Sequence, residues 1–143
     1  MKLMKLATIL LLTATMVFAQ GVKVPKEVTA SFKKLYPSAK TVEWKKNGKT
    51  EFEAKFKENG KAMTVNFASN GSVVETEAEI NFSELPKSVD TYIAGNFKDY
   101  KKIEAIKITD SKGSVTFETK LSKGKNSIEL LFDKGGKFLK KTA

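Results

Sequence analysis

The feature of the sequence that most constrains the fold is an internal repeat. The segment Val24–Val28 recurs as Leu85–Val89, with proline and lysine at the same two positions. Further along, Phe52–Phe56 matches Phe117–Leu121, with Phe, Glu and Lys again in order. Because two motifs recur in the same order, the sequence indicates one supersecondary unit present in two copies.

We therefore divide the chain after its N-terminal segment into two copies and a connector, at residues 24–80, 81–84 and 85–141. A unit this small buries only about 60% of its unfolded surface, so it is marginally stable alone. The connector is short and lacks the Gly/Ser composition of a flexible linker. We expect the two copies to share one continuous antiparallel sheet or a common core.

Within each copy, the hydrophobic pattern predicts one helix followed by four antiparallel strands. Val28, Phe32 and Leu35 recur at helical spacing after Pro25, and proline is favoured in the first helical turn. Strands that alternate apolar and polar residues follow, separated by Asn-Gly turns at 47–48, 59–60 and 70–71. This order indicates an α+β fold in which the helix covers the apolar face of the sheet.

The first 19 residues are typical of an export signal. Lys2 and Lys5 precede an apolar run at residues 6–16, and Ala19 stands at the expected cleavage site. The run is shorter than the roughly 20 apolar residues that a membrane-spanning helix needs. We therefore expect an exported chain, residues 20–143, in the periplasm or outside the cell, with no integral membrane segment after cleavage.

The composition excludes several classes of enzyme and site. The chain has no Cys and no His, and all 26 basic residues are lysines. A cysteine nucleophile, a thiolate zinc site and Ser-His-Asp chemistry are therefore absent. Glu75, Glu77 and Glu79 share one strand face and could offer oxygen ligands to calcium, but no calcium-loop motif accompanies them. We interpret them as a solvated edge strand, and predict a protein without catalytic residues, cofactor or metal.

The face of the sheet away from the helices is the candidate binding surface. Its predicted residues, with two tyrosines that we expect to be partly exposed, are Lys45, Glu51, Glu53, Lys55, Lys57, Tyr92 and Tyr100. The simpler interpretation is that opposite charges on this face pair across strands and stabilise the sheet. The functional interpretation is a polar platform for a protein partner. We expect this face to be flat or convex and solvated, so it would offer neither the cleft nor the raised pKa that a carboxylate hydrolase needs.

The single tryptophan, Trp44, alternates with Val42 on the first predicted strand. By this alternation it should face the helix and pack in the core. The alternative is an exposed anchor for a partner, because tryptophan is enriched at the centres of interfaces.

The charge of the chain suggests a second, different function. Removal of Lys2 and Lys5 with the signal lowers the formal net charge from +10 to +8. A charge of this size attracts anionic partners at low salt. Nucleic acid is a poor candidate, because arginine is absent and the longest basic runs are lysine pairs. Anionic envelope polymers or lipid head groups remain the alternative partners.

These motifs together carry a family resemblance. The series Val24-Pro25, Tyr36-Pro37, Trp44 and Asn70-Gly71, in this order, resembles the PepSY-like, β-lactamase-inhibitor-like family. Its members are small exported bacterial proteins with tandem helix-plus-four-strand repeats, so the resemblance implies that fold. The second copy departs from the pattern, with Lys98 in place of Pro37 and Ala105 in place of Trp44.

The leading hypothesis is an exported, non-enzymatic binding module. Its polar sheet face would meet an envelope or extracellular protein, and inhibition or regulation of an envelope enzyme is the sharpest form of this hypothesis. That sharper form rests on the resemblance alone, because a fold does not determine a function. The alternative hypothesis is a basic module that associates with anionic polymers or lipid head groups.

Overall fold

The computed structural model describes residues 21–143, so the predicted export signal at 1–19 lies outside the described residues. The described part of the chain contains two α-helices, one short 3-10 helix and eight strands. In chain order they are α1 (Lys26–Leu35), β1 (Glu43–Asn47), β2 (Glu51–Glu58), β3 (Lys61–Ala68), β4 (Val73–Ile80), η1 (Phe82–Glu84), α2 (Lys87–Asn96), β5 (Lys101–Asp110), β6 (Val115–Lys123), β7 (Asn126–Asp133) and β8 (Phe138–Thr142).

All eight strands form one antiparallel sheet in the order of the sequence, from β1 to β8. The two halves of the chain meet where β4 pairs with β5, in a register that runs from Glu75 opposite Asp110 to Ile80 opposite Ala105. The predicted α+β class is therefore correct. Of the two arrangements that the sequence left open, the single continuous sheet is the one observed.

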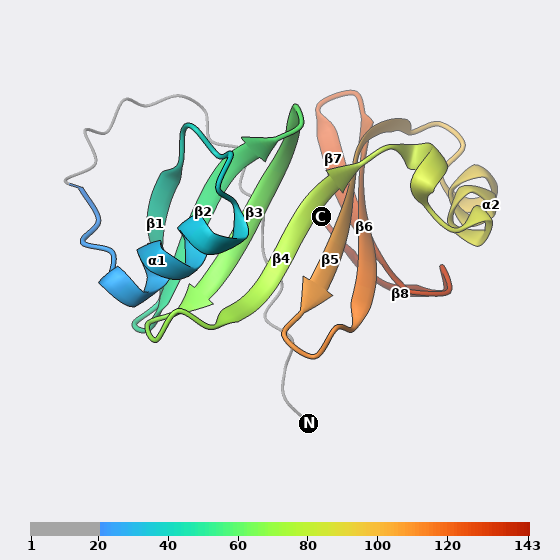
Figure 1. Ribbon diagram of the computed structural model, residues 1–143. Coiled ribbons are helices and arrows are strands. Elements are labelled where there is room, and N and C mark those ends of the chain that lie inside the picture. The colour runs from blue at the N-terminus through green and yellow to red at the C-terminus, as the bar shows by residue number, and fades with distance from the viewer. Residues whose placement is uncertain (1–20) are drawn as a thin grey trace.

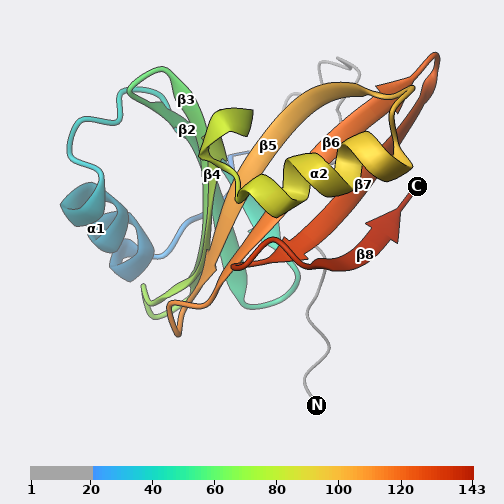
Figure 2. The same ribbon diagram turned by 90° about the vertical axis from the view of Figure 1, so that its right-hand side faces the viewer.

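Both helices lie on the same face of the sheet, and the sheet bends between its halves. Figure 1 looks onto α1 in front of the first strands, whereas the view turned by 90° in Figure 2 looks onto α2 in front of β5 to β8. The helices therefore flank the outside of the bend. The burial of residues along β5 is consistent with this direction of the bend. Lys107, on the helix side and so on the outside of the bend, is exposed, whereas Ile106, on the inside, is only 7% exposed.

The helices cover two separate apolar cores. In the first half, Phe32 of α1 lies against Phe56 of β2 with ring centroids 5.0 Å apart and against Trp44 of β1 at 5.3 Å. Trp44 thus faces the helix, as the alternation along its strand predicts. In the second half, Val89 and Ile93 of α2 are buried against the strands β5 to β7.

Two of the turns contain residues in the left-handed backbone conformation. Asn59 and Gly60 both have positive φ, of 51° and 79°, which is the two-residue turn that matches strand twist in a hairpin. Gly136 in the turn before β8 has a φ of 82° and lies against the start of α2. There Ser88 Oγ donates a 3.0 Å hydrogen bond to the carbonyl of Gly135, which fixes the turn to the helix.

The free edges of the sheet are β1 and β8. Each carries an exposed lysine pair, Lys45-Lys46 on β1 and Lys140-Lys141 on β8. The interpretation of the Glu75–Glu79 segment as an edge strand is wrong, since β4 pairs with β3 and β5 and lies in the middle of the sheet. None of the described helices is both long and apolar enough to cross a membrane.

Candidate functional site

We call the sheet face opposite the two helices the inner face, because it lies on the inside of the bend. Residues paired directly across antiparallel strands share a face, so the register defines its members. They include Glu43, Lys45, Glu51, Glu53, Lys55, Lys57, Thr64, Asn66, Glu75, Glu77, Glu79, Glu104, Ile106, Ile108, Asp110, Thr116, Glu118, Lys120, Glu129, Leu131, Asp133 and Lys140.

The structure places five of the seven predicted site residues together on the inner face, namely Lys45, Glu51, Glu53, Lys55 and Lys57. The two tyrosines lie on the opposite, helix-covered side. Tyr92 of α2 stacks on Phe138 with ring centroids 4.7 Å apart, and Tyr100 meets the ring of Phe97 edge-on at 5.5 Å. Both tyrosines are half-buried, as expected, but they do not lie on the uncovered face, because both rings pack against the core of the second half.

The inner face is rich in acid, although lysines outnumber acids in the whole chain by 26 to 16. Most of the carboxylates in the sequence lie on this face, and the lysines are concentrated on the helices, turns and sheet edges. The molecule is therefore electrostatically polarised, with an acidic inner face in a basic protein. Composition alone hides this, because strand pairing decides which residues share a face.

Two glutamates at the centre of the inner face are buried. Glu77 of β4 is 5% exposed and Glu118 of β6 is 6% exposed. The pKa of Glu77 is raised from its ordinary value of 4.5 to about 7, first by burial and then by the carboxylates of Glu75 and Glu53, against the attraction of Lys55. Burial also raises the pKa of Glu118 to about 7, with Glu129 and Glu77 as the next contributions.

The neighbours of these two residues show the same effect. Burial raises the pKa of Glu75, and the carboxylates of Asp110 and Glu51 add to it. Burial likewise raises the pKa of Glu104, with Glu79 as the next cause. The expectation of a flat, solvated face without raised pKa values is therefore wrong, because the bend removes water from the middle of the inner face.

A row of acceptor groups crosses the inner face beside Glu77. The register places Asn66 of β3 between Glu53 of β2 and Glu75 of β4. Asn66 is 5% exposed, and its Oδ1 has no hydrogen-bond partner among the described residues. Glu53 Oε1 lies 3.3 Å from Lys55 Nζ as an ion pair, but the described chain offers it no aligned hydrogen bond.

The buried centre of this site was missed from sequence. Asn66, Glu77 and Glu118 look like ordinary polar positions on alternating strands. One signal was available, because the predicted repeat aligns Glu118 with Glu53, a predicted site residue. Within the described residues no group of three His, Cys, Asp or Glu side chains is placed to hold a metal ion.

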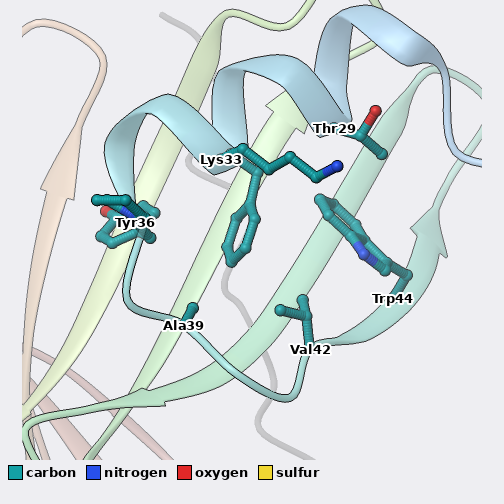
Figure 3. Close-up of a pocket in the computed structure, with 8 residues that line it drawn as sticks. Thr29, Lys33, Tyr36, Ala39, Val42 and Trp44 are labelled. Carbon is teal, nitrogen blue, oxygen red and sulfur yellow. The ribbon is translucent and has the colours of Figure 1, made fainter.

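A second feature is a cavity of about 430 Å³ between α1 and β1. It is lined by Thr29, Phe32, Lys33, Tyr36, Pro37, Ala39, Val42 and Trp44. Figure 3 shows Lys33 extending over the opening toward Trp44, with Ala39 and Val42 on the other side. Burial raises the pKa of Tyr36 in this cavity. The cavity lies on the helix side and is separate from the inner face.

Comparison with known proteins gives one family and several solved structures. Residues 19–73 and 50–140 match the family described as "Putative beta-lactamase-inhibitor-like, PepSY-like". No curated protein sequence matches the chain.

Three solved structures share the fold. A structure of "putative periplasmic proteins" from Bacteroides eggerthii has a TM-score of 0.76 at 22% identity, and the match covers 83% of this chain and 88% of that one. A DUF2874 family protein from Bacteroides uniformis has a TM-score of 0.74 at 20% identity, with the same coverage of 83% and 88%. A BLIP-like protein from Bacteroides fragilis has a TM-score of 0.69 at 23% identity, covering 86% and 88%. At these identities the likeness shows the fold alone.

Proposed function

Because the chain belongs to the beta-lactamase-inhibitor-like, PepSY-like family, we propose that it is an exported, non-catalytic module that binds a protein partner through its inner face. Inhibition or regulation of an envelope enzyme is the specific form of this function. The observation that carries the proposal is a sheet face whose central residues Asn66, Glu77 and Glu118 are almost inaccessible, although none of the described helices covers them. Such a face resembles half of an interface more than an ordinary solvated surface.

We place this function in the periplasm or outside the cell. The export signal predicted at residues 1–19 supports this location, as does the fold shared with the periplasmic Bacteroides eggerthii proteins. We also infer that the two halves are copies of one unit, with boundaries at 24–80 and 85–141. The same order of one helix and four strands in each half supports this division.

The acidic inner face favours a protein partner over an anionic polymer. A polyanion would be repelled by the carboxylates of Glu53, Glu75 and Glu77, and could meet lysines only on the helices, turns and edges. Contacts of that kind between exposed charges are screened strongly by salt. Salt resistance of binding therefore separates the two functions.

The test compares two lysines that lie on opposite faces of the sheet. Lys55 and Lys107 are both exposed on strands, but Lys55 is on the inner face and Lys107 is on the helix side. Lys55→Trp and Lys107→Trp remove the same charge and add the same bulk. The exported protein and both variants are immobilised, exposed to a native envelope extract and eluted with stepped salt.

The proposal predicts one protein that stays bound above about 0.5 M salt, where the Debye length is only a few ångströms. This protein should be retained by the wild type and by Lys107→Trp, and lost from Lys55→Trp. A broad set of acidic species that all three proteins release at low salt would contradict the proposal. That result would favour association of the basic outer surface with anionic polymers.

A further inference from the structure

The row Glu53–Asn66–Glu75 contains one buried acceptor without any donor, Asn66 Oδ1, beside a carboxylate oxygen of Glu53 whose one neighbouring cation is Lys55. Asn66 Oδ1 is buried and has no partner, and Glu53 Oε1 has only the unaligned approach of Lys55 Nζ at 3.3 Å. Buried polar atoms in folded proteins are nearly always hydrogen-bonded, so an orphaned acceptor requires an explanation. Here Asn66 and Glu53 are paired directly across β3 and β2, so their side chains lie on the same face.

The charges around the row specify the kind of donor that it lacks. Glu75 flanks Asn66 on the side away from Glu53, and Glu77 lies one row further along the same face of β4. The pKa of Glu75 and that of Glu77 are both raised, first by burial and then by neighbouring carboxylates. A neutral donor would satisfy Asn66 but would leave this repulsion in place. A cationic donor would both give Asn66 Oδ1 a hydrogen bond and reduce the repulsion between the carboxylates.

Geometry distinguishes between a metal ion and a cationic side chain. Divalent cations such as Ca²⁺ need several oxygens within about 2.6 Å of one point. The described carboxylates provide no cluster of three that could do this. Neighbouring strands lie about 4.8 Å apart, so the acceptors on β2, β3 and β4 span close to 10 Å. A planar guanidinium has five N–H donors spread over a fork and can reach separate acceptors.

We propose that the Glu53–Asn66–Glu75 row is the subsite at which the inner face receives an arginine or lysine side chain of its protein partner. This inference rests on the proposed function and specifies the chemistry of the partner at one point. On binding, the side chains of Asn66 and Glu53 turn outward so that their buried oxygens accept hydrogen bonds from the cationic head, and Glu75 and Glu77 supply the charge. Arginine suits the row better than lysine, because its donors are spread in a plane.

The test uses a small probe, so it does not depend on finding the partner. Exported protein labelled with ¹⁵N is titrated with N-acetyl-arginine amide, and separately with N-acetyl-citrulline amide, which has the same shape without the charge. The side-chain amide resonance of Asn66 is the direct reporter. We expect saturable shifts at Asn66 and at the backbone amides of Glu53 and Glu75 with the arginine compound only.

Two variants test the location. Glu75→Gln removes a charge from the row, and Glu129→Gln removes one from the inner face in the other half of the sheet. We expect Glu75→Gln to weaken binding of the arginine compound about tenfold, the usual size of one charge-assisted contact. Glu129→Gln should change it less than twofold. A dispersed amide spectrum for each variant confirms that it is folded.

Equal responses to arginine and citrulline compounds, or no response to either, would overturn the inference. So would saturation of the same resonances by millimolar CaCl₂ with higher affinity than the arginine compound, which would assign the row to a metal ion. The two experiments can also give different answers. If a partner binds the wild type and not Lys55→Trp, but the wild type does not bind the arginine compound, the proposed function is supported and this inference is overturned.

Discussion

The buried glutamate at the centre of the sheet should destabilise the protein at neutral and alkaline pH. The folded state raises the pKa of Glu77 from 4.5 to about 7, so the folded state binds the proton more tightly than the unfolded state does. The stability that this proton provides is fully present below pH 4.5 and is lost as the pH rises through 7. Replacement of Glu77 by glutamine, which mimics the protonated form, should therefore stabilise the protein above pH 7.

The magnitude follows from the size of the shift. Each pKa unit corresponds to about 1.4 kcal/mol, so a rise from 4.5 to about 7 sets an upper limit of about 3.5 kcal/mol for Glu77. Part of this is shared with Glu118, whose charge also repels Glu77, and water screens part of the remainder. We expect Glu77→Gln to raise the free energy of unfolding by about 2 kcal/mol at pH 8 and by less than about 1 kcal/mol at pH 5, where the unfolded carboxyl is only partly ionised.

Urea unfolding at pH 5 and pH 8 measures both values, with the Trp44 fluorescence as the signal. Glu79→Gln is the matched control, because Glu79 lies on the same strand and the same face but is exposed. It should change stability little at either pH. An equal effect of Glu77→Gln at the two pH values, or destabilisation at pH 8, would refute the argument that burial of the charge opposes folding.

Two further changes test other parts of the fold. Gly136→Ala would place a Cβ 2.1 Å from Ser88 Oγ and 2.8 Å from Pro86 Cβ, whereas Gly124→Ala meets open space at a similar positive φ. Urea unfolding should show that Gly136→Ala lowers the free energy of unfolding by at least about 2 kcal/mol more than Gly124→Ala does. Equal losses in the two variants would contradict the close approach of the turn to the helix. Ile93→Ala should lower stability by about 2–5 kcal/mol, and Trp44 in the other half should report the same transition as circular dichroism. Two separate transitions would mean that the β4–β5 pairing does not couple the halves.

The local pattern was sufficient to predict the secondary structure. Period-2 alternation in Phe52, Ala54 and Phe56 correctly assigned those residues to the helix side and placed Glu53 and Lys55 opposite. The Asn-Gly pairs correctly marked the turns, and at Asn59-Gly60 both residues adopt the positive φ that this pair favours locally. The helix stripe also held enough information to place Tyr92, which lies three residues after Val89 on the same helical face.

The long-range pairing was beyond the reach of the sequence. Glu75, Glu77 and Glu79 have the composition of an edge strand, and only the pairing of β4 with β5 makes that strand central. The bend of the sheet then buries Glu77 and Glu118 and exposes Lys107. The chemistry of the candidate site depends on that bend, so its residues could be assigned to a face but their pKa shifts could not be foreseen.

The lysine pairs on β1 and β8 have a consequence for how the protein behaves at high concentration. An open sheet ends in unpaired backbone groups that can add another strand, so β8 of one molecule is a template for β1 of the next. Joining these strands would bring Lys45 and Lys46 close to Lys140 and Lys141, four ammonium groups along one seam. The lysine pairs on the two edge strands therefore oppose edge-to-edge association of molecules into a filament. This protection weakens at higher salt, because salt shortens the range of the repulsion.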